Sequence, residues 1–348
     1  SNLYKECENL STKEMQERRN QLLKDMEEDN IDVAVFVPSK NLFYFTGNNL
    51  HQSERLFFYF LLKNGKGIYV VPRLEKDILI TFSNDEVITY SDEEGIESTK
   101  KNLINLLNEA NHIIVDKSSM RLIEFEYLHS INFKKYNDLA YYVNKYRMKK
   151  DKLEIEKIKT AVNILEESLM STIPMIEVGQ TEIAIAAKLE YEMRLRGSKG
   201  TPFPTIVASG YRGALPHGRA SEKKIEDGEL VIIDFGAIYE GYVADMTRVV
   251  NVGKVPNLAL EVHDVVKQAI QESFKQIEIG MEFQELDSIA RNIITEAGYG
   301  KYFTHRLGHG LGLDAHEEPY VVQNKKKLVE PGMVFTIEPG IYLPGQFG

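Results

Sequence analysis

Short apolar runs alternate with amphipathic stretches over the first 146 residues of the chain. Residues 13–29 place apolar side chains at helical spacing among Glu, Lys and Arg, which predicts an amphipathic helix. Residues 31–37 form an apolar run closed by Pro38, which predicts a buried strand. The same patterns predict strands at 56–62, 67–72 and 112–116, and a helix at 100–110. Strands that alternate with helices indicate an α/β domain.

Charged side chains dominate residues 146–152, where the pattern offers no apolar face. Because domain boundaries fall in such polar segments, we divide the chain into domains at 1–146 and 147–348. The second domain opens with a predicted helix. Its apolar face consists of Ile155, Ile158, Val162, Leu165 and Leu169.

The second domain contains a repeated motif. Residues 176–179, Ile-Glu-Val-Gly, match residues 277–280, Ile-Glu-Ile-Gly, at an offset of 101 (277 − 176). Each motif precedes an amphipathic helical stretch, and these stretches end at Gly197 and Gly298, again 101 apart. Matches at a constant offset indicate a fused duplication with internal pseudo-two-fold symmetry, although glycines at helix ends are common by themselves.

The repeat continues into two strands that each end in a carboxylate. Residues 225–228 match residues 329–332 at an offset of 104 (329 − 225). An apolar strand follows each, then Asp234 or Glu338, which are also 104 apart. Asp and Glu are depleted from strands, and a carboxylate buried alone is unfavourable. We expect these two carboxylates to occupy equivalent places on facing strands.

A third carboxylate, Asp245, lies 11 residues after Asp234 (245 − 234), a suitable distance for a hairpin that turns within residues 237–241. Both side chains then point to one side of the hairpin. Any one of these carboxylates could be separately capped or salt-bridged. Several of them in one buried place repel each other unless a cation neutralises them, so the set together favours a metal site.

Three of the eight histidines, His305, His309 and His316, fall within a dozen residues. Glycines at 308, 310 and 312 alternate around His309, which indicates close approach of neighbouring backbone. His217 precedes the first carboxylate strand, and we expect it to face the same cleft. The histidines without such context are interpreted as structural: His51, His112, His129 and His263.

Composition narrows the class of protein. The chain has 348 residues, 43% hydrophobic and 27% charged, which is typical of globular proteins. No apolar run approaches the roughly 20 residues of a membrane span, and the N-terminus lacks a signal-peptide core. A net charge of −10 without a basic stripe argues against nucleic acid as a partner. Cys7 is the only cysteine, which excludes an intramolecular disulfide and a zinc–thiolate site and fits a cytoplasmic location.

These motifs resemble the pita-bread metallopeptidases, which include methionine aminopeptidases, aminopeptidase P and prolidase. The resemblance covers residues 151–348 and includes the glycine-flanked histidine at 308–310 and the Thr-Ile-Glu-Pro-Gly stretch at 336–340. It implies an α+β pita-bread catalytic domain with internal pseudo-two-fold duplication, behind an α/β N-terminal domain. The implied metal ligands in this chain are Asp234, Asp245, His309 and Glu338.

Residues 41–47 resemble the segment after the first strand of creatinase-type N-terminal domains, which methionine aminopeptidases lack. Residues 147–159 resemble the entry to the catalytic domain of the Xaa-Pro group, and residues 216–218, 245–248 and 316–317 also match that group. By this resemblance three histidines line the substrate site and bind the substrate or stabilise the tetrahedral intermediate. They are His217, His305 and His316.

The family's remaining ligand is a glutamate in an Arg-x-Glu segment after the Pro-Gly-x-Tyr-x-Pro-Gly stretch, here residues 339–345. The repeat leads to the same place, because Asp245 displaced by 104 falls at position 349, one past Gly348. We therefore expect the natural chain to continue and to complete the two-metal site there.

The resemblance implies a homodimeric hydrolase that cleaves the bond between an N-terminal residue and a following proline, as an Xaa-Pro aminopeptidase or prolidase. Whether it prefers dipeptides or longer peptides stays open. Carboxylate-rich ligation with one imidazole suits two divalent cations, with Mn²⁺ expected and Co²⁺ or Zn²⁺ as alternatives. Glu338 is the expected acceptor of the attacking water's proton. The expected oxyanion donor is His217 or His316.

Four alternatives remain. A metal-free creatinase-type hydrolase would not need the four filled ligand positions, and a methionine aminopeptidase would lack the first domain. A catalytically inactive pita-bread binding protein would have no reason to keep the ligands, but the unaccounted fifth ligand keeps that hypothesis open. A mononuclear iron oxygenase usually uses two histidines and one carboxylate, whereas this set is dominated by carboxylates.

Overall fold

A computed structural model describes residues 2–107, 110–131, 133, 135–215 and 218–348 of the chain. It divides into two compact units, Ser1–Lys145 and Tyr146–Gly348, each described here by itself. Among the described residues, no helix has an apolar stretch long enough to cross a membrane.

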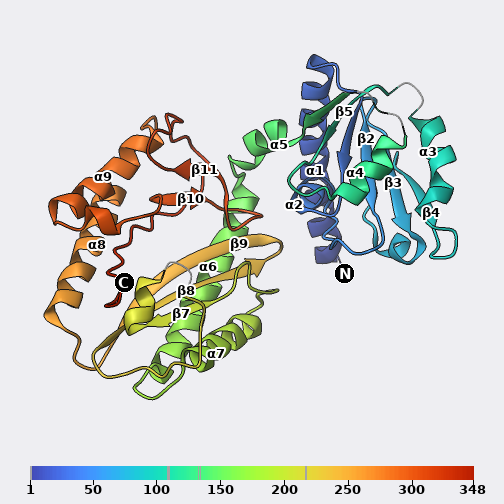
Figure 1. The fold of residues 1–348 in the computed structure, drawn as a ribbon. Coiled ribbons are helices and arrows are strands. Elements are labelled where there is room, and N and C mark those ends of the chain that lie inside the picture. Colours follow the sequence, from blue (N-terminus) through green and yellow to red (C-terminus); the bar gives the residue numbers. More distant parts are fainter. Residues whose placement is uncertain (1, 108–109, 132, 134, 216–217) are drawn as a thin grey trace. The chain divides into compact units, whose positions relative to one another are not determined.

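The first unit is built on a six-stranded mixed sheet of order β4-β3-β2-β1-β5-β6 (Figure 1). The central strand β1 pairs antiparallel with β2 and parallel with β5, and all four of its side chains are buried. The strands are β1 (Val33–Phe36), β2 (Phe58–Leu62), β3 (Gly67–Pro72), β4 (Glu86–Tyr90), β5 (His112–Val115) and β6 (Lys135–Asp138). The helices are α1 (Asn2–Glu28), α2 (Lys40–Thr46), α3 (Lys100–Leu106), α4 (Leu122–His129) and α5 (Ala140–Arg147), and short 3₁₀ segments span Arg73–Ile78 and Ile96–Thr99.

The predicted α/β organisation of this unit is confirmed. The four predicted strands correspond to β1, β2, β3 and β5, and the two predicted helices to α1 and α3. The edge strands β4 and β6 have no counterpart in the prediction, because neither forms an apolar run. Strand β4 mixes half-buried with buried side chains, and strand β6 mixes half-buried with exposed ones.

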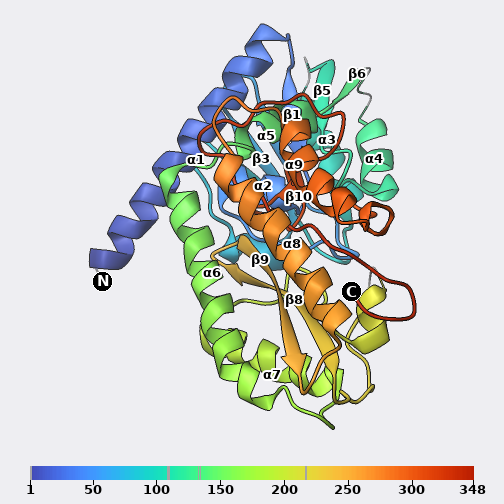
Figure 2. The ribbon, with the colours of Figure 1, turned by 90° about the vertical axis from the view of Figure 1, so that its left-hand side faces the viewer.

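The second unit places an antiparallel sheet of order β7-β8-β9 against two helices (Figure 1). Helix α6 runs along β8 and β9 (Figure 2), and one apolar core joins α6, α7 and the sheet. Helices α8 and α9 lie side by side and share a second core with the C-terminal residues. The elements are α6 (Lys152–Thr172), α7 (Glu182–Leu195), β7 (Ile206–Ser209), β8 (Glu229–Tyr239), β9 (Tyr242–Val252), α8 (Asn257–Gln276), α9 (Phe283–Glu296), β10 (Gly308–Gly310) and β11 (Glu317–Val321), with 3₁₀ segments at Ile173–Met175, Gly210–Ala214 and Gly300–Tyr302.

Backbone hydrogen bonds confirm the predicted duplication. The amide of Gly179 donates to the carbonyl of Ile225 at 2.9 Å, and the amide of Gly280 donates to the carbonyl of Val329 at the same distance. These donors are 101 residues apart and the acceptors 104 apart, which reproduces both sequence offsets. Both glycines adopt φ of +92°, a conformation that residues with a Cβ rarely take.

The second half departs from the first at Glu338, which we expected on a strand equivalent to β8. This segment is not a continuous strand. The amides of Thr336 and Glu338 donate to the carbonyls of His309 and Leu307, both at 2.8 Å. The amide of Leu311 donates back to the carbonyl of Val334 at 3.3 Å, which forms an isolated bridge between Gly310 and Phe335. The ladder does not continue from it, because the amide of His309 donates to the Thr336 hydroxyl and the amide of Leu307 donates to Asp287. The predicted regular strand is therefore wrong.

Candidate metal centre

The β8–β9 hairpin brings Asp234 and Asp245 to one face of the sheet. Asp234 lies opposite Thr247, and Asp245 lies opposite Gly236. The two carboxylates are thus diagonal neighbours, two positions apart, and their side chains project from the same face. The strands turn at residues 240–241, both with positive φ, as a tight two-residue hairpin requires. The predicted hairpin is confirmed.

Glycines on β10 let two other backbone segments approach His309 closely. A Cβ on Gly308 would lie 1.9 Å from the carbonyl oxygen of Thr336, and a Cβ on Gly310 would lie 2.5 Å from that of Glu318. Real Cβ atoms do not tolerate such distances. The alternating glycines are therefore needed so that both neighbouring segments can pack beside the histidine.

His309 is 3% exposed and is oriented by its own backbone. Its Nδ1 lies 3.0 Å from the carbonyl oxygen of Gly310, which can only accept a hydrogen bond, so Nδ1 carries a proton. Its Nε2 is directed at two carboxylates, 2.8 Å from Glu338 Oε1 and 3.4 Å from Asp245 Oδ2. The carboxylate segments of both halves of the repeat therefore meet at one imidazole.

Asp234 completes the cluster, and its ionised form is disfavoured by burial and by the neighbouring carboxylates. Burial, followed by the charges of Asp245 and Glu338, raises the pKa of Asp234 to about 8. Its Oδ1 is buried, and no hydrogen-bond donor among the described residues reaches it. Such an orphaned oxygen beside two other carboxylates is unfavourable without a positive charge.

Protons on the histidine compensate for this negative charge. Burial by itself lowers the pKa of His309, but its hydrogen bonds to Asp245 and Glu338 outweigh burial and raise the pKa to about 10. Burial likewise opposes ionisation of Glu338, whereas the hydrogen bond and charge of His309 prevail and lower the pKa of Glu338. The three carboxylates need a neighbouring positive charge. Together with one imidazole they form a donor set that fits divalent cations.

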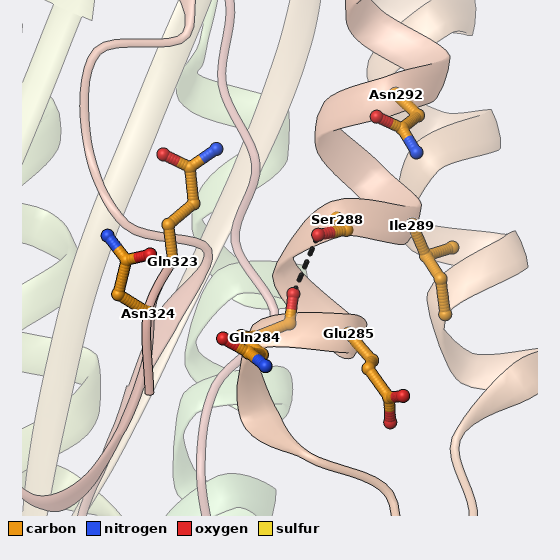
Figure 3. A pocket seen from close by; sticks show the side chains of 7 residues that line it. All are labelled: Gln284, Glu285, Ser288, Ile289, Asn292, Gln323 and Asn324. Atoms are coloured by element: carbon orange, nitrogen blue, oxygen red, sulfur yellow. Dashed lines mark hydrogen bonds between the residues drawn. The ribbon is translucent and has the colours of Figure 1, made fainter. Parts of the chain in front are cut away.

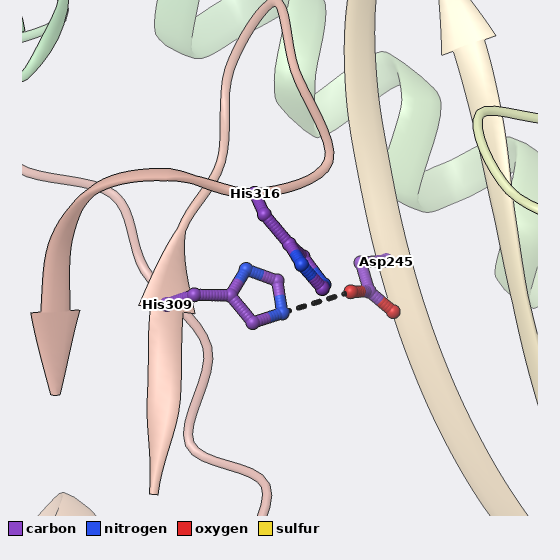
Figure 4. Close-up of side chains that lie close together, drawn as sticks. All are labelled: Asp245, His309 and His316. Carbon is purple, nitrogen blue, oxygen red and sulfur yellow. Dashed lines mark ion pairs between the residues drawn. The ribbon is translucent and has the colours of Figure 1, made fainter. Parts of the chain in front are cut away.

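His316 joins this cluster from the loop between β10 and β11. Single ligand atoms of Asp245, His309 and His316 all lie within 4.8 Å of one another (Figure 4). The two imidazole rings are 3.9 Å apart between centroids. Burial, then the neighbouring His309 and Arg306, lowers the pKa of His316, so its ring is neutral at physiological pH. His316 is exposed, whereas His309 is buried.

Of the other two predicted substrate-site histidines, the structure describes only His305. His217 lies outside the described residues. His305 donates from Nδ1 to the carbonyl of Arg306 at 2.7 Å, so its Nε2 accepts from the Tyr342 hydroxyl at 2.9 Å. Both ring nitrogens are thus engaged within the chain. Tyr342 had no role in the prediction, although it lies in the 339–345 stretch that carries the resemblance.

A buried ion pair on α9 fixes the segment between His305 and His309, and it was not predicted from the sequence. Asp287 is fully buried, and the guanidinium of Arg291 donates to it at 2.7 and 3.0 Å. Arg291 also donates to the carbonyl of His305 at 2.9 Å, and Asp287 accepts from the amide of Leu307 at 3.1 Å. An Asp and an Arg four residues apart on a helix were the available signal.

A second ion network fixes the loop that carries His316. Lys150, only 6% exposed, donates from Nζ to Glu317 Oε1 at 2.7 Å. Arg147 donates to Glu317 Oε2 at 2.5 Å and to Asp314 at 2.7 Å. Burial raises the pKa of Glu317, but the charges of Arg147 and Lys150 outweigh burial and lower it. Residues 146–152 thus contain two cations that meet a largely buried carboxylate, a contact that their charged pattern did not predict.

A separate cavity of about 560 Å³ lies between the start of α9 and residues 323–324 (Figure 3). None of the clustered carboxylates or histidines lines it. Its one carboxylate, Glu285, already accepts the amide of Glu282 at the helix start. The cavity is lined by Gln284, Glu285, Ser288, Ile289, Asn292, Gln323 and Asn324. It offers no group for catalysis, so the chemistry is assigned to the cluster.

Both units of the chain match known protein domains. The model of the creatinase/prolidase N-terminal domain matches residues 18–149, and the model of metallopeptidase family M24 matches residues 156–348. The Xaa-Pro dipeptidase of Pyrococcus furiosus is 37% identical over 330 residues, 95% of this chain and 92% of that protein. The prolidase of Thermococcus sibiricus has a TM-score of 0.89 at 35% identity, covering 95% of this chain and 91% of that one. The X-Pro aminopeptidase of Thermotoga maritima has a TM-score of 0.83 at 35% identity, covering 94% and 91%.

The raised pKa of Asp234 predicts a pH-dependent stability of the metal-free protein. The folded state keeps this proton up to about pH 8, whereas the unfolded state loses it near 3.8. The contribution to stability is therefore full below the unfolded pKa and is lost as pH rises through the folded pKa. With chelator present, the melting temperature of Asp234→Asn should overtake that of the wild type by a few degrees near pH 8. Added Mn²⁺ should raise the melting temperature of the wild type only. A constant difference between the two proteins from pH 5 to pH 8 would contradict this account.

The Glu317 network predicts a large stability loss on removal of one charge. Glu317→Gln leaves Lys150 and Arg147 buried without their full counter-charge, so urea unfolding should show a loss of about 3–5 kcal/mol. Glu330→Gln is the matched control. It breaks the half-exposed ion pair between Glu330 and Lys149, the residue that precedes Lys150 in the chain. That change should cost less than about 1 kcal/mol. Similar losses in both variants would refute the special role of Glu317.

Proposed function

The chain belongs to metallopeptidase family M24 and is a peptidase, and we propose that it hydrolyses the bond between an N-terminal residue and a following proline. One observation carries the proposal: Asp234, Asp245, His309 and Glu338 meet in a single cluster of the catalytic unit. The N-terminal creatinase/prolidase domain distinguishes the chain from methionine aminopeptidases. The relatives described above act, by name, on Xaa-Pro or X-Pro substrates.

The proposed ligands of two divalent cations are Asp234, Asp245, His309 and Glu338. The orphaned Oδ1 of Asp234 and the mutual repulsion of the three carboxylates support this assignment. When bound, the cations polarise the scissile carbonyl and lower the pKa of the attacking water. Mn²⁺ is the proposed ion, because oxygen donors dominate the set and only one imidazole is involved. Co²⁺ and Zn²⁺ are the alternatives that such donors also accept.

Glu338 is the proposed acceptor of the water's proton. Its Oε1 accepts from the Thr336 hydroxyl at 2.7 Å and faces His309 at 2.8 Å. These two contacts orient the carboxylate, and no hydrogen bond from the described residues reaches Oε2. Oε2 is therefore the oxygen available to take the proton, and the lowered pKa of Glu338 keeps it ionised beforehand.

His316 is the proposed donor to the developing oxyanion. Its ring is neutral and His316 is exposed, so a substrate carbonyl can reach it. A neutral imidazole donates one hydrogen bond and does not repel nearby cations. His217, which lies outside the described residues, stays the proposed alternative donor. His305, engaged by Tyr342, is proposed to hold the wall of the substrate site next to Glu338.

Two further properties belong to the proposal. A cytoplasmic location is supported by the single cysteine, which suits a reducing compartment. A homodimer is supported by the family resemblance alone. The net charge of −10 is consistent with small peptides as partners and argues against nucleic acid.

Metal dependence is the direct test of the proposed reaction. Chelator-treated protein should release proline from Ala-Pro at less than about 1% of the rate of Mn²⁺-loaded protein, since water activation depends on the cations. Chromatographic assay of free proline measures both rates. Full activity in protein shown by mass spectrometry to be free of metal would refute the mechanism.

The roles of Glu338 and His316 predict different losses. Glu338→Ala should abolish turnover and also reduce the bound metal. His316→Ala should lower kcat by about 10²- to 10³-fold, the usual effect of removing one oxyanion donor. His263→Ala is the control, because His263 lies on α8 and its nearest ion-pair contact is with Asp264, outside the cluster. Near-normal kcat in either site variant would reject the corresponding role.

A further inference from the structure

Leu307 is the residue through which helix α9 reaches both proposed ligands of the second repeat. It is fully buried, and its amide donates to Asp287 on α9 at 3.1 Å. Its carbonyl accepts from the amide of Glu338 at 2.8 Å. His309 follows two residues later, on β10. The position of this one short segment therefore sets the positions of both His309 and Glu338.

Arg291 extends the contact of α9 to the residues before Leu307. Its guanidinium donates to the carbonyl of Phe303 at 3.1 Å and to the carbonyl of His305 at 2.9 Å. Its central carbon also lies 4.1 Å from the centroid of the Phe303 ring. Asp287 orients the same guanidinium with hydrogen bonds of 2.7 and 3.0 Å. The pair thus engages main-chain groups at residues 303, 305 and 307 from a single helix.

Helix α9 is a rigid support for these contacts. Four of its apolar side chains are fully buried in the second core: Phe283, Leu286, Ala290 and Ile294. Asp287 is fully buried as well, and a carboxylate in such a place is unfavourable unless it is paired and hydrogen-bonded. Both of its oxygens accept from Arg291, and one also accepts from Leu307. A saturated polar pair on a packed helix holds its partners in one arrangement.

The first repeat carries other residues at the equivalent positions. At the offset of 101, Asp287 corresponds to Ala186 (287 − 101) and Arg291 to Glu190 (291 − 101). The two aspartates of the first repeat lie instead on β8 and β9, whose ladder is continuous along the whole of β8. In the second repeat the ladder beside the proposed ligands is interrupted. The ion pair on α9 therefore holds backbone that strand pairing holds in the first repeat.

We propose that Asp287 and Arg291 are positioning residues of the metal centre, which act through Leu307 to hold His309 and Glu338 where cations can bind. This inference rests on the proposed function, because it assigns the support of the same metal site. Side chains that are already held in place lose little conformational entropy when a cation binds between them. Removing the residues that orient metal ligands typically weakens metal binding 10- to 100-fold, about the change expected here.

The affinity for Mn²⁺ tests the proposal. Asp287→Asn keeps the shape of the side chain but removes the charge that orients Arg291. Calorimetric titration of chelator-treated protein with Mn²⁺ should give a Kd about 10- to 100-fold higher than that of the wild type. The Mn²⁺ concentration that gives half-maximal hydrolysis of Ala-Pro should rise by about the same factor.

Thermal melting separates a positioning role from a purely structural one. A structural role alone would lower Tm equally in chelator and in excess Mn²⁺, because the stabilisation by the bound cation would be unchanged. A positioning role also reduces the rise in Tm that Mn²⁺ produces. For an affinity weakened 10- to 100-fold, that rise should be smaller by about 3–10 °C in a unit of this size.

Two other variants complete the test. Glu192→Gln on α7 is the matched control, because Glu192 forms ion pairs with Lys188 and Arg196 at the same four-residue spacing and its side chain is 10% exposed. This change should lower Tm but leave the Kd for Mn²⁺ at the wild-type value. Arg291→Lys keeps the charge beside Asp287 without the planar fork that reaches two carbonyls, so its Kd should be intermediate. Arg291→Lys decides the question if Asp287→Asn does not fold.

Each outcome bears on a different claim. A wild-type Kd for Mn²⁺ in Asp287→Asn, or equal losses of Tm with and without Mn²⁺, would overturn the positioning role alone. A Kd raised as much in Glu192→Gln as in Asp287→Asn would also overturn it. Wild-type protein that binds no divalent cation would refute the proposed metal centre and this inference together. Wild-type protein that binds Mn²⁺ but leaves Ala-Pro intact would refute only the proposed reaction.

Discussion

Repulsion among three carboxylates is the constraint around which the catalytic unit is organised. Asp234, Asp245 and Glu338 are brought together by a hairpin and by an extended segment, and burial strengthens every charge interaction between them. Without cations, protons on Asp234 and His309 have to supply the missing positive charge. The proposed cations would supply this charge instead, so one arrangement of side chains underlies both the repulsion and the proposed metal binding.

Much of the fold and site could be predicted because the signals are local or repeated. A carboxylate after an apolar run, an offset of 11 with a turn glycine, and glycines around a histidine each express a short-range constraint. The offsets of 101 and 104 extended this reasoning from Asp234 to Glu338 and reappear in the hydrogen bonds of Gly179 and Gly280. The family resemblance then linked these features to peptidase chemistry.

The elements that could not be predicted depend on contacts between distant parts of the chain. Lys150 and Glu317 are 167 residues apart, and nothing in the local pattern distinguishes a lysine that will be buried from one in solvent. His305 and Tyr342 are 37 residues apart and form a hydrogen bond that the sequence around neither residue predicts. The missing strand at Glu338 has a similar origin, because Asp287 and the Thr336 hydroxyl take amides that a regular ladder would use.

The duplication also bears on the origin of the enzyme. Asp234 and Asp245 come from the first repeat, whereas His309 and Glu338 come from the second, so neither repeat alone holds all four of these proposed ligands. An ancestor of a single repeat would have needed a second copy to assemble the cluster, with the site on the rotation axis between identical subunits. After fusion into one chain, the two halves no longer had to share the same sequence. The imidazole could then arise on one side only, and the carboxylate strand could shorten there while its partner remained intact.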